Sequence, residues 1–71
     1  MTKPFFIGDA FDPKGVRRVY GYGRTAENAA AQTAKAVLEY VKKRPDTGPM
    51  AEWKITIQDA KFMPDGLIVR L

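Results

Sequence analysis

The side chains that could carry out chemistry are few in this sequence, and most of the usual catalytic types are missing. The 71 residues include no histidine, no cysteine and no serine. The chain therefore lacks the commonest general base, the commonest metal ligands and the serine and thiol nucleophiles. The acidic residues are spread along the chain, and their spacing predicts no catalytic pair of carboxylates. We expect a protein that is not an enzyme, with no catalytic residue, no metal site and no cofactor.

Arginine and tyrosine gather on one short segment, and these residue types are suited to binding. In a strand over residues 16–22, alternation places Arg18, Tyr20 and Tyr22 on one face and Val19 on the other. On an exposed sheet face, tyrosine rings stack on bases and arginines hold phosphates. With the two neighbouring arginines included, the candidate binding residues are Arg17, Arg18, Tyr20, Tyr22 and Arg24.

Two other interpretations of the same tyrosines stay open. The opposite register would make Tyr20 and Tyr22 core aromatics, with their hydroxyls at the edge of the core. Alternatively, an exposed Phe5 or Phe6 beside them would form an apolar patch suited to a protein partner.

The distribution of charge is also open to two interpretations. The formal net charge is +4, and residues 1–25 hold five basic and two acidic groups, whereas residues 45–71 hold three and four. A basic half favours polyanionic partners such as nucleic acid. A net charge of this size is equally typical of a small domain that stays in solution.

Turn residues and periodicity predict two hairpins separated by one helix. Asp12-Pro13-Lys14-Gly15 has the residue types of a tight turn, and Met63-Pro64-Asp65-Gly66 has similar turn chemistry. The helix is predicted over residues 26–43, with Thr25 as the N-cap and Pro45 preventing its continuation. The predicted strands cover residues 4–11, 16–22, 53–58 and 67–71.

These elements predict a single small α+β domain over residues 1–71, because the chain is too short for two. Its order is ββαββ, with one helix packed across an antiparallel sheet made from two hairpins. The residues expected in the core are Ile7, Val19, Ala29, Ala36, Val37, Tyr40, Val41, Trp53, Ile55, Ile57, Leu67 and Val69.

The N-terminal stretch predicts neither a secretory signal nor a membrane span. Only Phe5, Phe6 and Ile7 are consecutive apolar residues before Gly8 and Asp9, whereas a secretory core needs about 7–15. We therefore expect a cytoplasmic protein that does not contact the membrane.

The segment from Gly23 to Val41 resembles HicB-type antitoxin domains. The resemblance covers about half of the chain, and the preceding hairpin with Asp12 and Gly15 fits it. It implies a non-catalytic, oligomeric protein that binds a partner and carries a helix on a sheet. The matching residues are Gly23, Thr25, Glu27, Ala29, Ala36 and Tyr40.

The sequence therefore predicts a small non-catalytic binding module that acts through protein–protein contacts. Its partner would be a second copy, an antitoxin-like partner protein, or both. A sheet of four short strands leaves unpaired edges, so a homodimer is expected. The alternative is a nucleic-acid-binding protein that uses a basic and aromatic sheet face.

Overall fold

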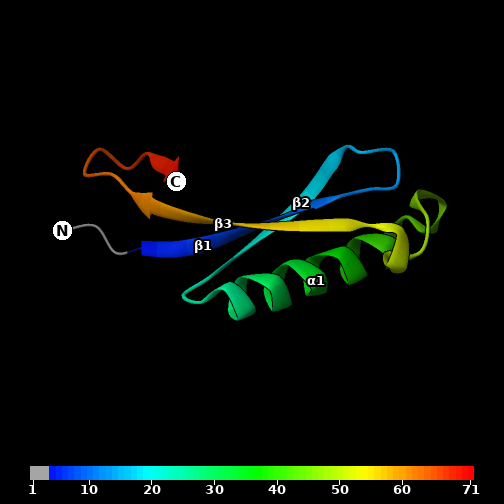
Figure 1. Cartoon of the computed structure of the whole chain (residues 1–71). Helices are drawn as coiled ribbons and strands as arrows, with labels where there is room; N and C mark the ends of the chain where they lie inside the picture. Colours follow the sequence, from blue (N-terminus) through cyan, green and yellow to red (C-terminus); the bar gives the residue numbers. More distant parts are fainter. Residues whose placement is uncertain (1–3) are drawn as a thin grey trace.

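The computed structural model describes residues 4–71, which fold as ββαββ (Figure 1). This element order confirms the predicted α+β class. Residues 1–3, which belong to the stretch used for the prediction on secretion, lie outside the described residues. The strands are β1 (Pro4–Phe11), β2 (Arg17–Gly23), β3 (Lys54–Phe62) and β4 (Ile68–Arg70), and the helix is α1 (Ala26–Lys43). Two short 3-10 helices, Pro45–Thr47 and Met50–Glu52, join α1 to β3.

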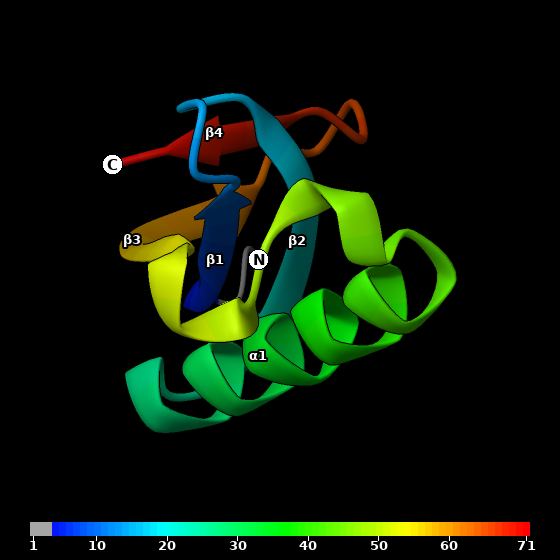
Figure 2. The same ribbon diagram turned by 90° about the vertical axis from the view of Figure 1, so that its right-hand side faces the viewer.

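The two hairpins lie side by side in one antiparallel sheet with the strand order β2-β1-β3-β4. β1 pairs with both β2 and β3, whereas β4 pairs only with the end of β3, from Ala60 to Phe62. α1 crosses one face of the sheet and contacts β1, β2 and β3 (Figures 1 and 2). We call the opposite face the open face; it carries Phe5, Ile7, Asp9, Arg17, Tyr20, Tyr22, Gln58, Phe62, Ile68 and Arg70.

The first hairpin closes as its residue types predict. The Gly15 amide donates to the Asp12 carbonyl at 2.8 Å, and Gly15 has a φ of 84°, which glycine adopts without strain. Asp12 Oδ1 accepts from the amides of Lys14 and Val16, both at 2.9 Å. The Asp12 side chain therefore fixes the turn from within.

The helix begins and ends where the sequence indicates. Thr25 Oγ1 accepts a hydrogen bond from the Asn28 amide at 3.0 Å, which confirms the N-cap. α1 lies close to β2, because a Cβ on Gly21 would stand 2.7 Å from the Thr33 amide nitrogen. Glycine in the strand is what permits this close packing.

The core lies between α1 and the sheet. Ala10, Val37 and Trp53 form its buried centre, and Tyr40 meets the Trp53 ring edge to face at 5.5 Å. Thr33 is also fully buried, and its hydroxyl donates to the Ala29 carbonyl at 2.7 Å. Of the residues predicted for the core, those that are buried or partly buried are Ile7, Val19, Ala29, Ala36, Val37, Tyr40, Val41, Trp53, Ile55 and Ile57.

The prediction that Leu67 and Val69 belong to the core is wrong. Leu67 is 64% exposed and Val69 is 37% exposed. Within residues 4–71, α1 makes no contact with β4, which lies across the molecule from the helix (Figure 2). Leu67, just before β4, and Val69 within it therefore stay uncovered, although their alternate positions are typical of a core strand.

Candidate functional site

Two tyrosines of β2 lie on the open face. Val19 packs against the core under α1, so the alternating Tyr20 and Tyr22 point to the other side, where they are 55% and 45% exposed. Their rings meet edge to face with centroids 5.3 Å apart. The alternative that placed both tyrosines in the core is therefore wrong. Partial burial raises the pKa of Tyr22 above 10.0, and the neighbouring Tyr20 hydroxyl adds to this shift.

The tyrosines continue into a longer row of aromatic rings. Phe5 lies between Tyr22 and Phe62, with ring centroids 5.8 Å and 4.9 Å away, and its ring stacks on that of Phe62. These rings line a hollow of about 360 Å³, and Arg24 lies at the same hollow. The row crosses the sheet from β2 through β1 to β3, and the pairing of β1 with β3 brings Phe62 into it.

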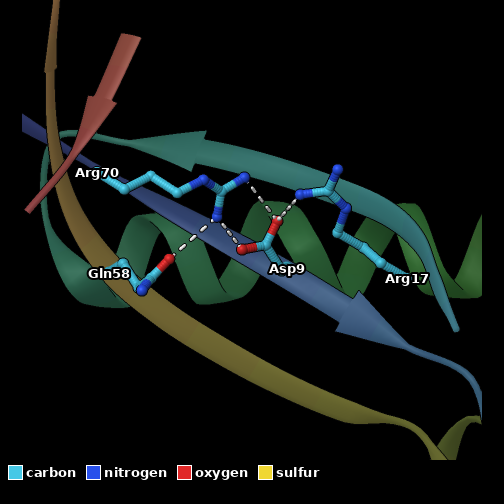
Figure 3. A network of polar contacts seen from close by, with 4 residues as sticks. All are labelled: Asp9, Arg17, Gln58 and Arg70. Atoms are coloured by element: carbon cyan, nitrogen blue, oxygen red, sulfur yellow. Dashed lines mark hydrogen bonds and ion pairs between the residues drawn. The ribbon is translucent and has the colours of Figure 1, made fainter. Parts of the chain in front are cut away.

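A buried carboxylate organises the charged part of the open face (Figure 3). Asp9 on β1 is only 3% exposed, and it accepts hydrogen bonds from both terminal nitrogens of Arg70, the Nη2 bond measuring 3.1 Å. Arg17 Nη1 lies 3.4 Å from Asp9 Oδ1, and Arg70 also donates to Gln58 Oε1 at 3.0 Å. The hydrogen bonds to Asp9 raise the pKa of Arg70. One carboxylate therefore fixes two guanidinium groups from β2 and β4.

Both arginines keep part of their surface exposed to solvent. The Arg17 side chain is 53% exposed and that of Arg70 is 37% exposed. A guanidinium has five N–H donors, so donors remain for a ligand after the bonds to Asp9. The two groups flank a hollow of about 170 Å³ that is also lined by Ile7, Tyr20, Tyr22 and Ile68.

Arg18 does not join this group, although alternation places it with the tyrosines. The pairing of β1 with β2 shifts register here, because Ala10 pairs with Val19 but Phe11 pairs with Arg17. Arg18 is thus an extra residue in β2, and the alternation of side chains between the two faces reverses at this point. Arg18 Nε instead donates to Asp12 Oδ2 at 3.0 Å, which raises the pKa of Arg18. Arg17 takes the place on the open face that alternation gave to Arg18.

Of the five candidate binding residues, four border the open face in the folded chain. Tyr20, Tyr22, Arg17 and Arg24 line its hollows, and Arg18 lies at the hairpin end. The residues that sequence reasoning missed are Asp9, Phe62 and Arg70. Alternation in the second hairpin could have grouped Phe62 with Arg70, but only the pairing of β1 with β3 brings them to Asp9.

The open face offers the chemistry of binding. It presents guanidinium donors for carboxylates or phosphates, and aromatic rings for stacking or apolar contact. Within residues 4–71, no cluster of acidic side chains is arranged to hold a metal ion. The only long helix described, α1, is not apolar enough to cross a membrane.

Comparison with protein-family models, with curated proteins and with solved structures finds no match for this chain. The function is therefore inferred from the residues of the open face.

Proposed function

We propose that this chain is a non-catalytic binding module that acts through protein–protein contacts, self-association included. The observation that carries the proposal is the uncovered apolar surface. Val16, Leu38 and Met50 are exposed elsewhere, but the other large apolar residues exposed in residues 4–71 gather on the open face and at the β3–β4 end of the sheet. They are Tyr20, Tyr22, Phe62, Leu67, Ile68, Val69 and Leu71.

Composition supports a protein partner for this surface. Soluble monomers seldom leave large adjoining apolar groups exposed, and such patches mark interaction sites. Tyrosine and arginine are the residue types that contribute most at protein interfaces. Here Asp9 holds Arg17 and Arg70 in place beside the tyrosines, so less side-chain freedom is lost on binding. An antitoxin-like partner, as the HicB-type resemblance implies, is one form of this function.

A second candidate function is binding of single-stranded nucleic acid. The observation that favours it is the placement of the Arg17, Arg24 and Arg70 guanidinium groups beside exposed tyrosine rings. Stacking on tyrosine and contacts from arginine to phosphate are the usual means of holding a single strand.

Sedimentation equilibrium over a wide range of protein concentrations tests the first proposal. The expected result is a mass that rises above the 7.9 kDa of the monomer as the concentration increases. A mass that stays at the monomer value up to millimolar concentration would contradict self-association.

A salt titration with a labelled oligothymidine separates the two functions. A protein-binding face should bind it weakly at low salt and lose it near physiological salt. A nucleic-acid-binding face with three phosphate contacts should instead give a slope of about −2 in log K against log salt. In that case Tyr22→Ala should weaken binding by about 1–3 kcal/mol, whereas Tyr40→Phe, on the helix side, should not.

A further inference from the structure

β2 has one side without a partner strand. It forms an edge of the sheet, and within residues 4–71 it pairs with β1 alone. In a strand, alternate backbone amides and carbonyls point to each side, so those on the outer side of β2 have no strand to bond. Such an edge is a template for another strand.

β2 also differs from the other edge in how it is protected. Proteins block exposed edges with short strands, lysine or proline. β4 has only three residues, and the part of β3 that extends beyond it begins with the exposed Lys54. β2 has seven residues and contains neither lysine nor proline, and its charged residues are confined to its first two positions. The last five positions of β2, residues 19–23, therefore form an edge stretch without charge, lysine or proline.

A groove of about 670 Å³ runs between this edge and α1. Residues 20–23 of β2 line one wall, and Asn28 and Gln32 of α1 line the other. Among residues 4–71, the charged residues at the groove are Lys35 and Glu39, whose charges cancel. A second copy of this chain, whose net charge is +4, would therefore meet no net charge when it pairs along residues 19–23, and Arg18 and Arg24 would lie only at the ends of the paired strands.

We propose that a second copy of the chain adds its β2 to this edge, antiparallel and across a two-fold axis. The proposal rests on the self-association proposed above and gives it a location. An edge strand paired with itself is complementary by symmetry, and the result is one continuous sheet with both helices on the same face.

The positions of the tyrosines select the register. Tyr20 and Tyr22 both point to the open face and flank Gly21. With the axis at Gly21, Tyr20 of each copy lies opposite Tyr22 of the other, and each ring gains an aromatic cross-strand partner. The two open faces then join, and their aromatic side chains form one surface.

Cysteine cross-linking tests this register, because the chain has no cysteine of its own. Directly opposed residues of antiparallel strands lie within disulfide distance. A mixture of the Tyr20→Cys and Tyr22→Cys variants should form mixed disulfide dimers faster than either variant forms its own. Equal rates in all three samples, or no cross-linked dimer, would overturn the register.

A charge introduced at the edge provides the second test. Tyr20→Lys should raise the dimer dissociation constant at least about tenfold, while circular dichroism shows the fold unchanged. The matched control is Leu38→Lys, which adds the same charge at an exposed position of α1, outside the proposed interface, and should dimerise as the wild type does. A dimer that tolerates Tyr20→Lys would overturn the proposed pairing at β2 but would leave self-association unchallenged. A wild-type chain that is always monomeric would overturn both.

Discussion

The two faces of one sheet differ in what their side chains contact. On the helix face, β1 and β2 contribute Gly8, Ala10 and Gly21, and small residues there let α1 approach closely. On the open face, the same strands contribute Asp9 and Tyr20. The helix face is closed by the chain's own helix, whereas large side chains remain uncovered on the open face.

The same alternating strands therefore serve two purposes, stability on the helix face and binding on the open face. Residues under α1 determine stability, because volume added at Gly21 or Gly23 meets backbone atoms of α1. Residues on the open face can change with less effect on folding, since solvent surrounds much of their surface. Substitutions on the helix face should therefore affect stability most, and those on the open face should affect binding.

The largest expected effect comes from adding one methyl group on the helix face. Gly21→Ala places a Cβ 2.7 Å from the Thr33 amide nitrogen and 2.9 Å from the Gln32 carbonyl carbon, both backbone atoms. α1 must shift, and we expect the free energy of unfolding in urea to fall by about 3 kcal/mol. Tyr20→Phe, at the next residue but on the open face, should change it by less than about 0.5 kcal/mol. Equal stability of Gly21→Ala and wild type would show that α1 lies farther from β2.

An intermediate effect is expected at Asp9, a buried charge on the open face. Asp9→Asn removes the carboxylate that holds Arg17 and Arg70. Loss of a buried ion-pair partner costs about 3–5 kcal/mol, but solvent reaches both arginines, so we expect about 1–2 kcal/mol. Urea unfolding measures this loss in the free energy of unfolding. A variant as stable as the wild type would show that Asp9 does not organise the face.

A smaller effect should follow from Asp12 in the hairpin turn. The amide of Val16 bonds to the carboxylate and holds the pKa of Asp12 below 3.8, with further contributions from Arg18 and Lys14. The folded chain therefore gains stability above the unfolded pKa and loses it as the pH falls through the lower folded pKa. Unfolding measured from about pH 5 to about pH 2 should depend less on pH in Asp12→Asn. Identical pH profiles would contradict this role of Asp12.

The smallest effect concerns Tyr22 at alkaline pH. Its folded pKa is raised above 10.0, chiefly by partial burial, so the neutral phenol is favoured in the fold. The resulting stability is present below pH 10.0 and is lost as the pH rises through the higher folded pKa. Tyr22→Phe should remove this alkaline loss, whereas Tyr20→Phe, which removes only the smaller contribution of the Tyr20 hydroxyl, should retain part of it. The opposite pattern would show that the raised pKa does not belong to Tyr22.

Much of the fold could be predicted from local signals. Asp12 to Gly15 has the residue types of a tight turn, and Thr25 with Pro45 sets the limits of α1. Alternation also placed Tyr20 and Tyr22 opposite Val19, as the structure has them. These features depend on residues that are close in the sequence.

Features that depend on distant pairing could not be predicted. The ion pair of Asp9 with Arg70 joins residues 61 positions apart, and it requires the pairing of β1 with β3. Leu67 is exposed because, within residues 4–71, α1 makes no contact with β4. The register shift beside Ala10, which exchanges Arg17 and Arg18, has no distinct signal in the residue types.

The most direct test of the central claim is a dilution series of the ¹⁵N-labelled chain followed by two-dimensional NMR. The claim is that β2 and the open face form the interaction surface and that the helix side does not. As the concentration rises, amide signals of Tyr20, Gly21 and Tyr22 should shift together, whereas those of Leu38 and Lys42 on the outside of α1 should stay fixed. Shifts confined to α1, or none at any concentration, would contradict the account.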